Sequence, residues 1–128
     1  MLSLVYVSSA TRLLSEEDLK ALLAQSRDKN KRLGLTGLLL YKDGNFMQVL
    51  EGAEDALLGT YASIQSDTRH HGILELIRQP VQEREFASWS MGFKNLKDVN
   101  LTEPLNSAGF QADPSRAQKL LGMFRQKM

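Results

Sequence analysis

The sequence predicts an α+β protein with the element order β-α-β-β-α-β-β and a C-terminal helical tail. Short, β-branched or unbroken apolar runs are typical of buried strands. Two longer segments place apolar residues at helical spacing. The turn Lys42–Asn45 separates two apolar runs and predicts a β-hairpin. With right-handed crossovers, this order gives a ferredoxin-like fold, a five-stranded mixed sheet with two helices on one face.

The first half of the chain supplies the first strand, a helix and the hairpin. Residues 2–8 (LSLVYVS) predict the first strand. Ser15 is an N-cap followed by acidic residues that suit the helix dipole, and the helix is expected to run to about Asn30. The hairpin strands are expected at Gly34–Tyr41 and Asn45–Glu51.

The second half continues with a helix, two strands and a tail. We expect a helix at Glu54–Ser66, strands at Ile73–Val81 and Ser88–Phe93, a loop at Asn95–Ala112 and a helix at Ser115–Gln126. Asp113 and Pro114 supply the N-cap and the first turn of that last helix. Its apolar residues share one face, which is expected to cover the second face of the sheet. The alternative is that this face contacts a partner.

The composition indicates a single soluble domain and excludes several classes of protein. A chain of 128 residues can bury a hydrophobic core without the help of disulfides or metal ions. The net charge of +1, from 16 basic and 15 acidic residues, gives no electrostatic footprint for nucleic acid. The absence of cysteine excludes disulfides, thiolate metal sites and cysteine nucleophiles. No apolar run is long enough to span a membrane. We therefore expect a cytoplasmic protein with no metal site and no membrane or nucleic-acid partner.

A polar pair is expected on the two central strands. Tyr6 shares a strand face with Ser8, and Gln48 shares one with Phe46. If both faces meet the helices, the phenol of Tyr6 and the amide of Gln48 approach each other in a mostly apolar pocket. A buried amide needs several hydrogen-bond partners, and a phenol supplies only some of them. Gln48 is therefore expected to bond to a further group.

Leu4–Phe93 resembles the BLUF domain, a blue-light sensor that binds flavin. The matching segments are LVYVSSAT, LSEEDLKALLAQSRDKNKRLGLTGLLLY, FMQVLEG, Asp67–His70 and WSMGF from Trp89. They occur in order over about three quarters of the chain.

The resemblance implies roles for individual residues. Tyr6 corresponds to the light-driven electron and proton donor, and Gln48 to the glutamine between it and the N5/O4 edge of the flavin. Asn30 corresponds to the asparagine that holds the carbonyl and N3–H edge. Trp89 and Met91 correspond to the strand-five pair, one of which lies near the glutamine. The other implied flavin contacts are Asp67, Arg69 and His70 at a polar edge, and Ser8, Phe46 and Ile64 along the pocket.

The resemblance also implies a cofactor and a way of signalling. The cofactor is FAD, with FMN as the alternative. The segment after Phe93 is too short for a cyclase, a phosphodiesterase or a DNA-binding domain. The chain is therefore expected to be a non-enzymatic, stand-alone sensor that signals by homo-oligomerisation or through a separate protein. We expect a flavin-binding domain at residues 1–95 and a helical extension at 96–128.

Three other classes of protein compete with this interpretation. An acylphosphatase-like hydrolase on the same fold would use Arg12 and Asn30, but residues 7–11 lack the glycine of an anion-binding loop. An RNA-binding sheet would need Tyr6 and Phe46 exposed beside a basic face. A flavin-dependent oxidoreductase would need a nicotinamide or electron-partner motif, and none is present.

Overall fold

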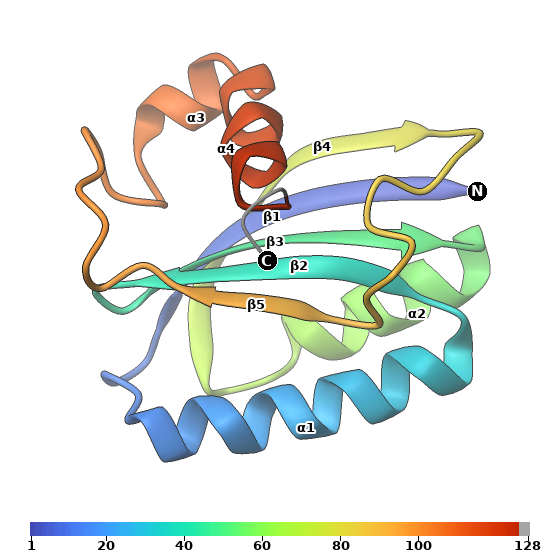
Figure 1. Cartoon of the computed structure of the whole chain (residues 1–128), viewed down its shortest axis with the longest axis horizontal. Coiled ribbons are helices and arrows are strands. Elements are labelled where there is room, and N and C mark those ends of the chain that lie inside the picture. The colour runs from blue at the N-terminus through green and yellow to red at the C-terminus, as the bar shows by residue number, and fades with distance from the viewer. Residues whose placement is uncertain (126–128) are drawn as a thin grey trace.

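Five strands and four helices make up the part of the chain that the computed structural model describes, residues 1–125 (Figure 1). They are β1 (Leu2–Ala10), α1 (Glu16–Leu33), β2 (Thr36–Lys42), β3 (Asn45–Gly52), α2 (Glu54–Gln65), β4 (His70–Pro80), β5 (Gly92–Asn95), α3 (Ala108–Ala112) and α4 (Ser115–Arg125). None of these helices combines the length and the apolar character that crossing a bilayer requires.

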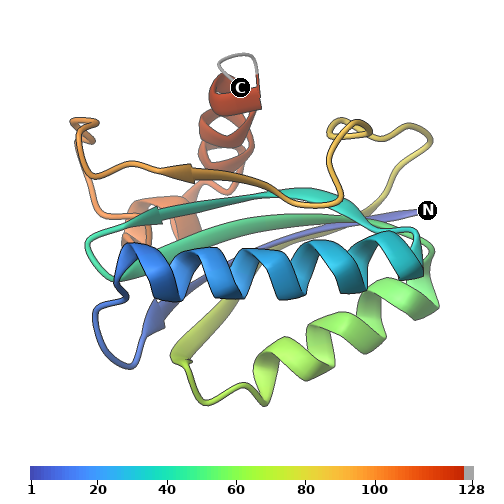
Figure 2. The same ribbon diagram turned by 60° about the horizontal axis from the view of Figure 1, so that its bottom comes forward.

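The strands form one mixed sheet in the order β4-β1-β3-β2-β5. The β1–β3, β1–β4 and β2–β3 pairs are antiparallel, and β2–β5 is parallel. Figure 2 shows α1 and α2 on one face of the sheet and α4 on the other. The predicted ferredoxin-like order, and the placement of β3 beside β1, are confirmed.

Alternation along the central strands divides the interior into two apolar cores. On β1, Leu4 and Tyr6 belong to the core under α1 and α2, whereas Val5 and Val7 belong to the core on the opposite face. α3 and α4 close this second core. Their buried side chains are Phe110, Ala117, Leu121 and Phe124. The expectation that the last helix covers the second face is confirmed.

The first helix ends later than the sequence pattern predicts. α1 continues to Leu33, and Gly34 is its C-cap rather than the start of a strand. Gly34 has φ 71°, a left-handed conformation that glycine adopts without steric cost, and its N–H bonds back to the carbonyl of Asn30. β2 therefore begins only at Thr36. The predicted capping of α1 by Ser15 is confirmed.

The strand prediction at Ser88–Phe93 is wrong in its bounds. β5 spans Gly92–Asn95, so Trp89 and Met91 lie in the irregular connection before it. A turn in which the N–H of Trp89 donates to the carbonyl of Phe86 replaces the expected strand start. In consequence Met91 belongs to the core under α1 and α2, and Trp89 packs against the opposite core.

Smaller differences concern β1, which continues to Ala10, as well as β4, the loop before the last helix and the end of that helix. β4 begins at His70 instead of Ile73, which extends the strand to the residue beside the pocket described below. The expected loop at residues 95–112 contains the short helix α3, which Ser107 caps. The predicted end of the last helix, Gln126, lies outside the described residues.

Candidate functional site

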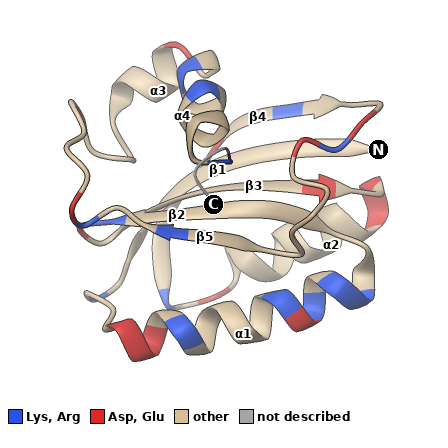
Figure 3. Cartoon of the chain, viewed as in Figure 1, with Lys and Arg blue, Asp and Glu red and all other residues tan. Residues whose placement is uncertain are grey.

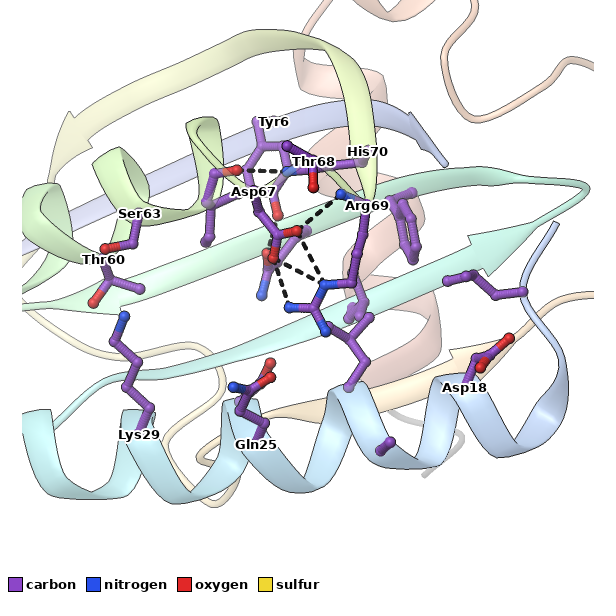
Figure 4. A pocket seen from close by; sticks show the side chains of 18 of the residues that line it. Tyr6, Asp18, Gln25, Lys29, Thr60, Ser63, Asp67, Thr68, Arg69 and His70 are labelled. Carbon is purple, nitrogen blue, oxygen red and sulfur yellow. Dashed lines mark hydrogen bonds and ion pairs between the residues drawn. The ribbon is translucent and has the colours of Figure 1, made fainter. Parts of the chain in front are cut away.

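A pocket of about 580 Å³ lies between α1 and α2, with β1 and β3 as its floor (Figure 4). Both helices, the two central strands and the connection from α2 to β4 contribute side chains to its lining. The predicted cofactor-binding residues that line it are Tyr6, Asn30, Phe46, Gln48, Ile64, Asp67, Arg69 and His70. The tertiary structure brings together residues that lie far apart in the sequence. Tyr6 and His70 are 64 positions apart, and their ring centroids are 6.4 Å apart.

The amide of Gln48 is bonded at both ends. Tyr6 and Gln48 are direct partners in the β1–β3 register, and the Tyr6 hydroxyl donates to Gln48 Oε1. Gln48 Nε2 donates to the sulfur of Met91 at 3.4 Å. Both Tyr6 and Gln48 are almost fully buried. The predicted phenol–amide contact is confirmed, and the further partner that the amide requires within the protein is a thioether.

The Tyr6 phenol is held in its protonated form. Burial raises its pKa well above the ordinary value of a tyrosine, and the nearby Tyr61 and Asp67 raise it further. The two tyrosine rings pack with their centroids 5.6 Å apart. Tyr6 is therefore a hydrogen-bond donor at neutral pH, which suits its bond to the amide oxygen.

The residues before β5 divide between the two faces of the sheet. Met91 is 1% exposed and reaches Gln48 from beside the pocket. Trp89 packs on the ring of Phe86 at a centroid distance of 6.1 Å, on the face away from the pocket. The resemblance implied that one of these two residues lies near Gln48, and in this structure it is Met91.

Helix α1 holds the backbone that carries Met91. Asn30 is 3% exposed, and its Nδ2 donates to the carbonyl of Ser90 at 2.8 Å. Arg27 Nε donates to the carbonyl of Met91, also at 2.8 Å. Asn30 therefore both lines the pocket and fixes the segment that bonds Gln48.

The end of the pocket near β4 carries an ion pair and an imidazole. Asp67 and Arg69 make an ion pair of 2.6 Å, and Arg69 holds the pKa of the Asp67 carboxyl below its usual value. His70 Nε2 lies 2.6 Å from the carbonyl of Ile64, which can only accept, so Nε2 carries a proton. His70 Nδ1 lies 2.9 Å from the hydroxyl of Ser8. Ser8 is fully buried and contacts His70, but unlike His70 it does not line the pocket.

Thr60 is a pocket residue that the sequence interpretation missed. It is 5% exposed, and its Oγ1 is buried without a hydrogen-bond partner among residues 1–125. In Figure 4 it lies on α2 beside Ser63, with the Lys29 side chain of α1 pointing toward it. Its position in the sequence could have indicated that it lines the pocket. Thr60 lies four residues before Ile64, a predicted pocket residue, and therefore shares a helix face with it.

The pocket offers the groups that a flat heteroaromatic ring with a polar edge requires. Aromatic and aliphatic side chains form its walls, and three amides, a phenol and an ion pair also line it. The unpartnered Thr60 hydroxyl is a further group that a bound molecule would satisfy. A flavin fits this donor set. No cluster of three or more metal-ligating side chains occurs within the described part of the chain.

Comparisons with known proteins relate the chain to proteins that use a flavin. The model of the BLUF family, described as sensors of blue light using FAD, matches residues 1–92. A photoactivated adenylate cyclase subunit beta of Euglena longa is 40% identical over 90 residues, which are 70% of this chain and 10% of that protein. The chain thus spans about a tenth of the length of the curated relatives it matches.

Solved structures resemble the whole described fold. The dark-state structure of BlrB, a BLUF protein, has a TM-score of 0.81 and 28% identity, covering 99% of this chain and 96% of that one. Klebsiella pneumoniae BlrP1 with FMN and cyclic diGMP has a TM-score of 0.72 and 34% identity, covering 91% of this chain and 36% of that one.

Proposed function

Because the chain belongs to the BLUF family of blue-light sensors that use FAD, we propose that it is a photoreceptor whose responsive element is the Tyr6–Gln48 pair. The observation that carries this proposal is the hydrogen bond from the buried Tyr6 hydroxyl to Gln48 Oε1, at the floor of a pocket that fits a flavin. The same amide bonds Met91 through its nitrogen, so both of its ends are set by the protein.

In this proposal the pocket residues divide the work of holding the cofactor. Asn30 and Gln48 would bind the polar edge of the ring, and Phe46 and Ile64 would pack on its apolar part. Asp67, Arg69 and His70 would face the remaining polar groups, with Ser8 supporting His70. Bound flavin supplies the absorption of blue light and an acceptor for an electron.

The chain itself supplies a proton donor and a reversible hydrogen-bond switch. A phenol is oxidisable, and the bond to Gln48 gives its proton an acceptor when the electron leaves. The amide has a donor end and an acceptor end, so rotation or tautomerisation exchanges what it presents to Tyr6 and to Met91. The switch is therefore a local change of hydrogen bonds that must bias a second element.

The proposal extends to cofactor, domains and partners. FAD is the expected cofactor, and the structure of BlrP1 with FMN keeps FMN as the alternative. Residues 1–95 would form the sensor and 96–128 an extension packed on its second face. The chain would itself be non-enzymatic and signal by self-association or through a separate protein. The cysteine-free sequence fits a cytoplasmic location.

The geometry does not support a hydrolase or an RNA-binding sheet. Arg12, the proposed anion-binding residue of a hydrolase, is exposed and paired with Asp18 at 3.3 Å. Asn30 is engaged with the carbonyl of Ser90. Tyr6 and Phe46, the aromatics of an RNA-binding sheet, are each no more than 5% exposed and lie under the helices.

An absorption spectrum tests the proposal. The purified protein is loaded with FAD, and its spectrum is recorded in darkness and directly after blue light. A small red shift of the flavin band without bleaching, reversed in darkness, is the expected result. Failure to bind FAD or FMN would overturn the proposal. Lasting bleaching that a reductant substrate accelerates would instead indicate an oxidoreductase.

A further inference from the structure

Glu51 is a buried carboxylate that the proposed light response does not use. It lies at the end of β3 and is 2% exposed. Its Oε1 accepts hydrogen bonds from the N–H of Phe86 at 3.0 Å and from the hydroxyl of Thr36 at 2.9 Å. Its Oε2 accepts from the N–H of Glu85 at 2.7 Å. Burying a carboxylate costs free energy unless hydrogen bonds compensate it. Moving the backbone of Glu85 or Phe86 would break these bonds, so the carboxylate holds both residues in place.

The contacts of Glu51 belong to a wider attachment of the β4–β5 connection. Arg84 donates to the hydroxyl of Thr36 at 2.9 Å and to the carbonyls of Gly34 and Glu51 at 2.7 Å and 3.2 Å. Figure 3 shows acidic and basic residues together where this connection passes the end of β3. The connection is therefore tied to the sheet by polar bonds.

One strand holds both ends of the segment from Glu85 to Met91. Glu51 binds the beginning of this segment, and Gln48 binds the sulfur of Met91 at its end. Because they are three positions apart along the strand, the side chains of Gln48 and Glu51 leave β3 on opposite faces of the sheet. Between these two points, the N–H of Trp89 donates to the carbonyl of Phe86 at 3.1 Å. The end of the segment is held as well, because Arg27, Asn30 and the N–H of Gly37 donate to the carbonyls of Met91, Ser90 and Trp89. Glu51 adds the restraint at its beginning.

We propose that Glu51 is a positioning residue for Met91: by holding the backbone of Glu85 and Phe86, its carboxylate keeps the thioether sulfur against the Gln48 amide and so governs the rate of dark recovery. This inference rests on the proposed photoreceptor function. Once the ends of the Gln48 amide have exchanged, recovery needs an acceptor in place for Nε2. A segment that is released at Glu85 and Phe86 holds the sulfur there for a smaller fraction of the time, and recovery slows.

Glu51→Gln tests the inference because it keeps the shape of the side chain. An amide has one acceptor oxygen, so its NH₂ group would face the N–H of Glu85 or Phe86, two donors in opposition. We expect dark recovery to slow about tenfold, the effect of one lost charge-assisted hydrogen bond. Glu83→Gln is the matched control, since it removes an exposed carboxylate from the same connection. It should leave recovery unchanged.

A double-mutant comparison separates positioning from general destabilisation. In a Met91→Ala background there is no sulfur to position, so adding Glu51→Gln should change recovery by less than about twofold. If Glu51→Gln slows recovery equally in both backgrounds, or leaves it unchanged in the wild-type background, the inference is overturned. Thr36→Val removes one donor to the same carboxylate and carries the same test, with a smaller effect, if Glu51→Gln does not fold.

A second readout does not depend on flavin. Trp89 is the single tryptophan of the chain and packs on Phe86, whose N–H is held by Glu51. In the flavin-free protein, Glu51→Gln should shift Trp89 emission to longer wavelength, and Glu83→Gln should not. Unchanged Trp89 emission in Glu51→Gln would overturn the attachment itself. A missing light response in the wild-type protein, with the emission shift present, would instead overturn the proposed function.

Discussion

Tyr6 and Gln48 are direct cross-strand partners in the β1–β3 register, and the hydroxyl of one donates to the amide oxygen of the other. Residues paired in this way have their Cβ atoms about 5 Å apart on the same face. The contact is thus built by two central strands instead of by loops. The strand pair holds donor and acceptor together, while the third partner, Met91, comes from an irregular connection.

Gln48→Leu should retain flavin and abolish the light-induced red shift. Leucine fills a similar volume but has no polar ends to exchange, so the switch between Tyr6 and Met91 is lost. Difference spectra before and after blue light measure the effect. Gln25→Leu is the control and should keep the red shift. Gln25 is an exposed residue of α1 that also lines the pocket. A red shift that persists in Gln48→Leu would contradict the assigned role.

The stability of the flavin-free protein should fall in alkaline solution, and Tyr6→Phe should reduce this fall. The pKa of Tyr6 is raised in the folded state, while an unfolded tyrosine ionises near pH 10. Below about pH 10 both states keep the proton. Above it only the unfolded state releases the proton, so the free energy of unfolding drops by up to about 1.4 kcal/mol per pH unit for this group.

Denaturant titrations at about pH 9, 10 and 11 measure this dependence. The pKa of Tyr61 is also raised by burial, so Tyr6→Phe should remove only part of the decline. An identical alkaline decline in the wild-type protein and in Tyr6→Phe would show that Tyr6 does not keep its proton.

Asn30→Ala should lower both stability and flavin affinity. The substitution leaves the partly buried carbonyl of Ser90 without the Asn30 donor, which costs about 1 kcal/mol in the free energy of unfolding. It also removes an amide from the pocket lining. Urea titration of the flavin-free protein and fluorescence titration with FAD measure the two effects. Lys20→Ala, at an exposed position of the same helix, should change neither.

Thr60→Val should stabilise the flavin-free protein but weaken its binding of flavin. The Thr60 hydroxyl is buried without a partner among residues 1–125, and replacing it by a methyl group of the same shape should stabilise the flavin-free protein by about 1 kcal/mol. If flavin bonds that hydroxyl, the affinity for FAD should fall about tenfold. Ser63→Ala is the control, because Ser63 already donates to the carbonyl of Gly59. Unchanged affinity in Thr60→Val would show that the hydroxyl does not contact the cofactor.

Local patterns in the sequence were sufficient for most of the fold. The hairpin turn is an example, since Asp43 and Gly44 take φ values of 50° and 82°, as a two-residue turn with left-handed residues requires. Period-two alternation likewise grouped Gln48 with Phe46 on one strand face, and the structure shows that the helices cover this face. The extent of α1 was not predictable from its apolar spacing, because its end depends on the left-handed conformation of Gly34.

The element order, the burial of both faces of the central strands and most of the pocket-lining side chains could therefore be predicted from residue patterns and from the family resemblance. The packing of the chain, which residue patterns do not specify, places Met91 and not Trp89 against Gln48 and leaves the Thr60 hydroxyl without a hydrogen-bond partner among residues 1–125. Periodicity specifies the face of a residue within a regular element. Met91 lies outside such an element, and its place is set by bonds from residues far away in the chain, Arg27 on α1 and Gln48 on β3.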